Sequence, residues 1–337
     1  MKKILVTGGL GFIGFHFVKH LAQTNRYELA VADNREYFFE KGITNYRYYL
    51  ALREAELTRL NIPVYSVPLH QPEEMKRTYY EISPDIVVHF AGLPVAGVAD
   101  YFPELARTHI FDTTFHLLDI FSEKRPEQFV YISSSMVYGD FPKDRSGNMI
   151  PPSEDFPCMP TDIYGSLKLC CENMVRAFHL RKKLTYTIIR PSAVYGFTDC
   201  NFRVTELFAA RALSGKPLLL DNGGRHLLDF TCVTDLVKGI ALTLENDYAV
   251  NETFNLSAGQ GRSIAELAAI ISREIPETVI EETPCKPFRP NRGAMNISKA
   301  KLKLGYSPVY TLEKGMKEYL AQMKEHLPNL SYPEKYY

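Results

Sequence analysis

Tyr164 and Lys168 are the residues whose types and spacing most clearly indicate chemistry. They lie four positions apart, so on a helix they share one face, one turn from each other. A phenol with a pKa near ~10 is a poor base at neutral pH, but a neighbouring ammonium group favours the phenolate. Ser134 follows an apolar run and has a hydroxyl that can orient an alcohol and pass on its proton. We therefore expect Ser134, Tyr164 and Lys168 to be catalytic and to deprotonate an alcohol.

The first thirty-three residues contain the elements of a dinucleotide site. The apolar residues before Thr7 predict a buried strand, and Gly8, Gly11 and Gly14 then open a stretch with helical apolar spacing. These glycines allow a tight turn, close approach of a diphosphate to the backbone, and packing of helix on strand. A second predicted strand, 28–32, ends at Asp33, whose carboxylate can accept hydrogen bonds from both ribose hydroxyls of NAD. The stretch predicts bound NAD.

Strand-like and helix-like segments alternate through the rest of the first half. We expect strands at 62–67, 85–90, 129–133 and 185–190, the last closing the sheet, and helices at 46–60, 72–81, 103–124 and 162–183. This alternation predicts an α/β fold, a Rossmann-type doubly wound parallel sheet with right-handed crossovers. Ligands bind beyond the carboxyl ends of such strands. Ala91, Gly92 and Ser133 to Ser135 should therefore face the cofactor.

Beyond Pro191 the predicted elements become shorter. They include a helix at 205–213, a strand at 217–220, a sheet strand at 253–256, and a helix opened by the capping box of Ser263 and Glu266. We expect residues 1–191 to form the NAD-binding domain, with 231–257 returning to it. Residues 192–337 would mainly form a smaller C-terminal substrate-binding domain.

Composition excludes several classes of partner. Thirty-nine basic residues balance thirty-nine acidic ones, so no overall field favours nucleic acid or an anionic membrane. We expect no membrane span. The six cysteines lack metal-ligand spacing and suit free thiols in the cytoplasm. His16 and His20 lie one helical turn apart without a third ligand nearby, and we expect no metal site.

Five segments together resemble the extended short-chain dehydrogenases/reductases, and within them the nucleotide-sugar epimerases, chiefly UDP-glucuronate and UDP-glucose 4-epimerases. The segments are Thr7 to Gly14, Val88 to Gly92, Ser133 to Gly139, Tyr164-x-x-x-Lys168 and Arg190-Pro191-x-x-Val194-Tyr195-Gly196. The residues after Asp33-Asn34 and Leu52 to Ala55 look like the insert of the UDP-glucuronate 4-epimerases.

The resemblance implies a mechanism and a set of site residues. Tyr164 would take the proton of the sugar 4-hydroxyl while NAD accepts hydride from C4. The 4-keto sugar would then turn over and be reduced on its other face, so NAD is recycled. A homodimer would form through the helices at 103–124 and 162–183, with Phe111, Phe115, Leu118, Phe121, Met174 and Phe178 available for its interface or for the core. The expected cofactor-binding residues are Gly8, Gly11, Phe12, Ile13, Gly14, Asp33, Asn34, Leu69, Phe90, Ala91, Gly92, Ser133, Tyr164, Lys168 and Pro191.

Departures from the family pattern concern the substrate. Leu228-Asp229-Phe230 stands where these enzymes usually have Arg-Asp-Phe, and leucine cannot bind a diphosphate. Arg225, Arg289 or Arg292 would replace that arginine, although each would equally suit a solvated surface. Ser134 and Ser135 complete the expected substrate-binding set. Pro68 replaces an acid that holds adenine, which leaves the Leu69 backbone, and Ala193 replaces a frequent polar contact.

Three other activities remain open. A dehydratase or decarboxylase of this superfamily has an acid two positions beyond the catalytic hydroxyl, where this chain has Met136. A 4-ketosugar reductase using NADPH would place Arg35 near the 2′-phosphate, which Asp33 would repel. A non-catalytic NAD-binding regulatory protein would be expected to have lost Tyr164 or Lys168, and both are present.

Overall fold

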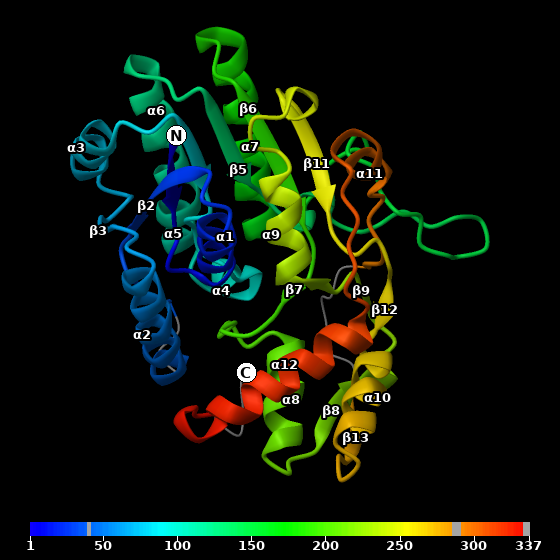
Figure 1. Cartoon of the computed structure of the whole chain (residues 1–337). Helices are drawn as coiled ribbons and strands as arrows, with labels where there is room; N and C mark the ends of the chain where they lie inside the picture. Colours follow the sequence, from blue (N-terminus) through cyan, green and yellow to red (C-terminus); the bar gives the residue numbers. More distant parts are fainter. Residues whose placement is uncertain (39–41, 285–290, 333–337) are drawn as a thin grey trace.

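A seven-stranded, entirely parallel sheet forms the centre of the molecule (Figure 1). The structure, a computed structural model, describes residues 1–38, 42–284 and 291–332. The strands run in the order β11-β6-β5-β4-β1-β2-β3. Their bounds are β1 Lys2–Thr7, β2 Tyr27–Asp33, β3 Val64–Ser66, β4 Ile86–His89, β5 Gln128–Ile132, β6 Tyr186–Pro191 and β11 Glu252–Leu256. The predicted doubly wound α/β fold is confirmed.

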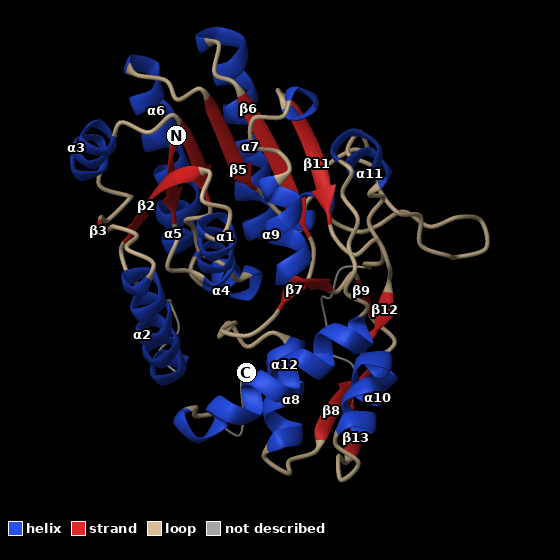
Figure 2. Ribbon diagram, viewed as in Figure 1, coloured by secondary structure: helices blue, strands red, loops and turns tan. Residues whose placement is uncertain are grey.

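Helices cover both faces of this sheet because its central strands are apolar on both sides (Figure 2). Within β1, Ile4 and Val6 pack into one core cluster, while Leu5 packs into the other. The first face is covered by α1 (Phe12–Ala22) and α9 (Val233–Ala241). The second is covered by α3 (Pro72–Ile82), α6 (Thr113–Glu123) and α7 (Ile163–Lys182). The central strands β4 and β5 are thereby buried on both faces.

One strand and one helix differ from the sequence-based prediction. The strand at 185–190 does not close the sheet, because β11 pairs with β6 on its outer side. The long helix at 103–124 is present but is not uniform: α5 (Pro103–Ala106) leads into a π-helical turn, Arg107–Asp112, and then into α6. The wider turn inserts an extra residue before α6, and such turns are frequent at functional sites.

A second, smaller group of elements lies beyond the carboxyl edge of the sheet, at the bottom of Figure 1. Helices α8 (Val204–Leu213), α10 (Ile264–Glu274) and α12 (Leu312–His326) pack around the strand pair β8 (Leu218–Asp221) and β13 (Ile280–Thr283). The predicted capping box of Ser263 and Glu266 opens α10. The remaining α-helices and β-strands of the described residues are α2 Ile43–Arg59, α4 Ala96–Tyr101, β7 Val194–Tyr195, β9 Leu227–Leu228, β10 Thr231–Cys232, β12 Arg262–Ser263 and α11 Ser298–Leu304.

The residues suggested for a dimer interface divide between core and surface. Leu118 and Phe121 are fully buried against the sheet and belong to the core. Phe115 remains 43% exposed.

Within the described residues, no helix combines the length and apolar character that a membrane crossing requires.

Candidate active site

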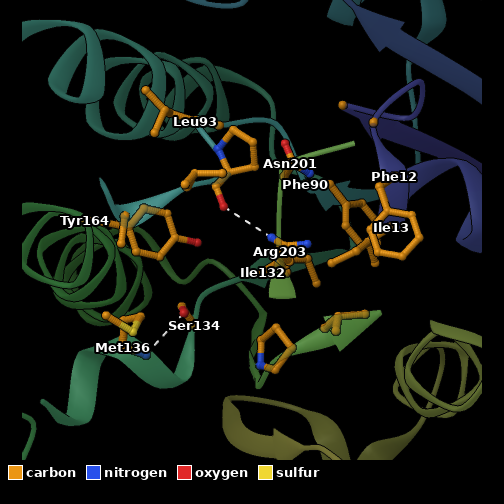
Figure 3. Close-up of a pocket in the computed structure, with 18 of the residues that line it drawn as sticks. Phe12, Ile13, Phe90, Leu93, Ile132, Ser134, Met136, Tyr164, Asn201 and Arg203 are labelled. Carbon is orange, nitrogen blue, oxygen red and sulfur yellow. Dashed lines mark hydrogen bonds between the residues drawn. The ribbon is translucent and has the colours of Figure 1, made fainter. Parts of the chain in front are cut away.

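A cleft of about 710 Å³ opens between the carboxyl edge of the sheet and the smaller group of elements (Figure 3). Its volume lies in the range usual for small-molecule and cofactor sites. All the predicted catalytic and cofactor-binding residues line it, as do Ser135 and Arg292. Residues from both ends of the first half of the chain therefore meet in one place.

The glycine loop forms one wall of the cleft, and Gly8 and Gly14 leave no room for a side chain. Gly8 has a φ of +71°, and a Cβ there would lie 2.6 Å from the backbone nitrogen of Ala91. A Cβ on Gly14 would lie 2.3 Å from the carbonyl oxygen of Gly8. Gly11, the N-cap of α1, places no side chain over the helix N-terminus. The exposed N–H groups and the helix dipole suit a diphosphate.

Asp33 stands at the end of β2 with its carboxylate held in place. Its Oδ2 accepts a hydrogen bond from the Leu10 N–H at 3.0 Å, and its Oδ1 accepts one from the Arg35 N–H at 2.8 Å. Burial raises the pKa of Asp33, and these hydrogen bonds oppose the rise. Arg35 is engaged with Glu54, with Nε and Oε1 2.6 Å apart. A buried carboxylate beside a neutralised arginine fits the ribose hydroxyls of NAD better than a 2′-phosphate.

Tyr164, Lys168 and Glu172 form a stripe along α7, each one turn from the next. Lys168 Nζ donates a hydrogen bond to the carbonyl oxygen of Ile132 at 2.9 Å and lies 5.9 Å from the centre of the Tyr164 ring. Lys168 is 5% exposed. Burial lowers its pKa to about 8, although Cys171 and Glu172 act in the opposite direction. The ammonium group is thus held beside the phenol by the end of β5.

Glu172 joins α7 to the ends of β5 and β6 through a fully buried network. Arg190 donates to both of its carboxylate oxygens, from Nε at 2.9 Å and from Nη2 at 2.7 Å. Ser133 Oγ donates to the same carboxylate at 2.6 Å. Burial would raise the pKa of Glu172, but these donors lower it overall. Because Ser133 directly precedes Ser134, the network positions Ser134 as well as α7.

The Tyr164 hydroxyl points into the cleft, toward Ser134 and Arg203 (Figure 3). We expected a lowered pKa for this phenol, but burial raises it. The positive charge of Arg203 and a hydrogen bond from Ser134 oppose the rise. The reason for the difference is that removing the phenolate from water outweighs the charges that the protein itself places nearby.

Arg203 is a residue that sequence reasoning missed. Its Nη1 pairs with Asp199 Oδ2 at 3.1 Å, and its Nη2 donates to the Pro94 carbonyl oxygen at 3.3 Å. It lies in a segment without helical or strand periodicity just before α8, so no pattern placed it near Tyr164. The only sequence signal was its position soon after the Val194-Tyr195-Gly196 segment.

The three candidate arginines have different surroundings. Arg292 lines the cleft, is 7% exposed, and donates to the carbonyl oxygens of Ser135 and Gly139 at 3.1 and 3.3 Å and also to the Ser135 hydroxyl. Burial lowers its pKa to about 10. Arg225 is exposed and is not among the residues that line the cleft. Arg289 lies outside the described residues.

Leu228 lines the cleft, whereas Asp229 beside it is buried and structural. The Asp229 carboxylate accepts hydrogen bonds from the Met295 N–H at 2.9 Å, the Gly259 N–H at 3.0 Å and the Ser257 hydroxyl at 2.7 Å. Burial raises its pKa to about 6 against these donors. Asp229 thereby fixes the segment that carries Arg292 into the cleft.

A doubly wound parallel sheet with a Tyr-x-x-x-Lys pair and a serine at its carboxyl edge defines the extended short-chain dehydrogenase/reductase class. A model of the NAD dependent epimerase/dehydratase family matches residues 4–257, and the chain belongs to this family. The protein is therefore an NAD-dependent enzyme of this family.

Three known proteins illustrate the breadth of the family. The chain is 31% identical over 290 residues to the bifunctional protein GAL10 of Kluyveromyces lactis, covering 79% of this chain but only 40% of that protein. It is 27% identical to UDP-glucuronic acid decarboxylase 1 of Arabidopsis thaliana, covering 97% of this chain and 71% of that protein. The crystal structure of UDP-glucose 4-epimerase from Thermotoga maritima with UDP-glucose matches with a TM-score of 0.84 and 25% identity, over 96% of this chain and 99% of that one.

Proposed function

We propose that this protein is a nucleotide-sugar 4-epimerase that acts through a transient 4-keto intermediate. Its similar proteins include a 4-epimerase, a decarboxylase and a 4,6-dehydratase, so their names do not separate these chemistries. The choice between them depends on which proton donors line the cleft.

The observation that carries the proposal is the distribution of carboxylates. Among the described residues that line the cleft, only Asp33 and Glu36 have carboxylates; Asp33 ends β2 and Glu36 follows it, at the end of the cleft expected to bind the adenosine. Met136 lies two residues beyond Ser134 and brings a thioether to the cleft. Elimination of water needs an acid for the leaving hydroxyl. Epimerisation at C4 exchanges a proton with a single hydroxyl, so it needs only Tyr164 and the side chains beside it.

Each catalytic side chain has a definite role in this proposal. The Tyr164 oxygen takes the proton of the sugar 4-hydroxyl and returns a proton to the same sugar oxygen after the 4-keto sugar has turned over and been reduced on its other face. The Ser134 hydroxyl, which accepts a hydrogen bond from the Met136 N–H at 3.1 Å, holds the alcohol oxygen. Lys168 and Arg203 favour the phenolate by their charge. NAD, when bound, supplies the hydride acceptor that becomes the donor for the second half of the reaction.

Arg292 is the residue best placed to hold an anionic part of the substrate. It is buried, it lines the cleft, and the hydrogen bonds described above join it only to neutral oxygens. A buried guanidinium without a carboxylate partner attracts an anion. We propose that Arg292 replaces the arginine that is absent at Leu228.

Incubating the purified protein with a panel of nucleotide sugars tests the activity. NMR should show inversion at C4 without accumulation of NADH, and mass spectrometry of the denatured protein should show released NAD. Stoichiometric consumption of NADPH with a 4-keto sugar would instead support a reductase. Retained NAD with no turnover of any sugar would favour the regulatory protein.

Two further proposals come from the resemblance. The protein would form a homodimer through α6 and α7 and would be cytoplasmic. Light scattering after size exclusion should give twice the mass of one chain. Replacing the exposed Phe115 with Glu should reduce the measured mass to that of a single chain. A monomer at all concentrations would contradict the dimer.

A further inference from the structure

Three side chains from separate segments meet beside Asp33, away from the catalytic tyrosine. Glu36 follows β2, His70 follows β3, and His109 lies in the π-helical turn before α6. One ligand atom from each lies within 4.8 Å of those from the other two. Glu36 and His109 also line the cleft.

The two histidines are poorly satisfied by the protein itself. The Nδ1 of His70 is buried and has no hydrogen-bond partner among the described residues. His109 Nε2 and Glu36 Oε2 are 3.6 Å apart, too far for a good hydrogen bond. A buried imidazole nitrogen without a partner carries a desolvation cost that a ligand would remove.

The surroundings hold these groups in orientations that a metal could use. The Phe38 ring packs edge-on against His109 with centroids 4.7 Å apart, and the rings of His70 and His109 lie 5.2 Å apart. Asn34 Nδ2 donates to Glu36 Oε2 at 2.6 Å, and the Glu36 N–H donates to Asn34 Oδ1 at 3.1 Å. Such outer contacts orient metal ligands.

We propose that Glu36, His70 and His109 form a binding site for a zinc-class divalent metal ion at the Asp33 end of the cleft. Two imidazoles and a carboxylate suit Zn²⁺ better than Mg²⁺ or Ca²⁺.

To bind a metal ion, the three ligand atoms need to move only slightly closer together. Ligands about 2.0–2.1 Å from a tetrahedral zinc ion lie about 3.4 Å from one another. Glu36 is 45% exposed at its side chain, so its carboxylate can rotate toward the histidines without disturbing the core. The fourth coordination position would face water or an occupant of the cleft. The sequence predicted no metal site because these three residues are far apart in the chain.

Metal binding to the untagged wild-type protein tests this proposal without reference to catalysis or to the proposed activity. Titration with Co²⁺, followed by its visible absorption and by competition with Zn²⁺, should show one bound ion without thiolate bands. Glu36→Gln and His70→Gln should each weaken binding about tenfold or more. Because neither side chain is in the apolar core, both variants should keep the wild-type thermal transition.

His20→Gln is the matched control. It removes a half-buried histidine from α1, on a different part of the protein, and should bind Co²⁺ as the wild type does. The proposal is overturned if no ion binds up to millimolar concentration, if Glu36→Gln and His70→Gln bind with wild-type affinity, or if His20→Gln loses binding equally. Thiolate-to-metal absorption bands would likewise overturn it, because they place the ion on cysteine.

Discussion

The two walls of the cleft are built in different ways. The wall around Tyr164 comes from α7 and from the ends of β5 and β6, and its polar groups are held by buried hydrogen bonds to Glu172, Arg190 and Ile132. The wall around Leu228 and Arg292 comes from short strands and connecting segments of the smaller group of elements. The first wall is fixed by the sheet, whereas the second depends on how loops pack.

This difference indicates that the sheet-built wall suits proton transfer and that the loop-built wall suits substrate selection. A proton-transfer group needs precise placement, which regular elements supply. In the proposed function, the substrate contact moves between loop positions, from residue 228, which is a leucine here, to the buried Arg292. The following predictions test whether the two walls respond to mutation as differently as they are built.

Tyr164→Phe should have the largest effect. It removes the proton acceptor from the sheet-built wall, and the loss of general base catalysis should lower kcat about 10³-fold. The ring remains, so the thermal transition and the NAD content should not change. Steady-state epimerisation assays measure the effect, and a kcat within a factor of a few of the wild type would contradict the assignment.

Glu172→Gln should destabilise the same wall. The change leaves the buried Arg190 guanidinium without its carboxylate, at a cost of about 3–5 kcal/mol of unfolding free energy. Urea unfolding measures this. The matched control is Glu123→Gln, which breaks the solvent-exposed pair with Lys76 and should leave stability unchanged; equal losses in both variants would contradict the importance of burial.

Because of Lys168, the free energy of unfolding should change with pH in the alkaline range. Its pKa is about 8 in the folded protein and 10.5 when unperturbed, so between these values the unfolded chain binds more protons. Stability should therefore rise as pH increases from 8 to 10.5, by about 3 kcal/mol at most. Lys168→Met should abolish this rise, whereas Lys301→Met on the surface of α11 should retain it.

Arg292→Lys should give the smallest effect and test the loop-built wall. Lysine keeps a charge but loses the planar pair of donors, so KM for the nucleotide sugar should increase about 10- to 100-fold with a smaller change in kcat. Arg225→Lys, at an exposed position, should not change KM. An unchanged KM in Arg292→Lys would remove Arg292 from the proposed substrate site.

The sequence predicted the sheet-built wall well because its signals are local. The apolar strand before Ser134 and the four-residue spacing of Tyr164 and Lys168 each lie within one element, and the glycine spacing spans only the short connection from β1 into α1. Arg203 could not be predicted because nothing in its own segment indicates which element it meets. The buried position of Leu118 and the edge position of β11 depend on long-range packing.

Because of the π-helical turn at Arg107–Asp112, the shape of one end of the cleft depends on the number of residues in that turn. Deleting one residue from this turn would restore regular α-helical winding and rotate everything before it by about 100° relative to α6. His109 would then swing away from Glu36, while Leu117 and Leu118 would keep their places against the sheet. A single-codon deletion would thus reshape one end of the cleft, and it would also turn the buried Ala106 and Ile110 away from the core.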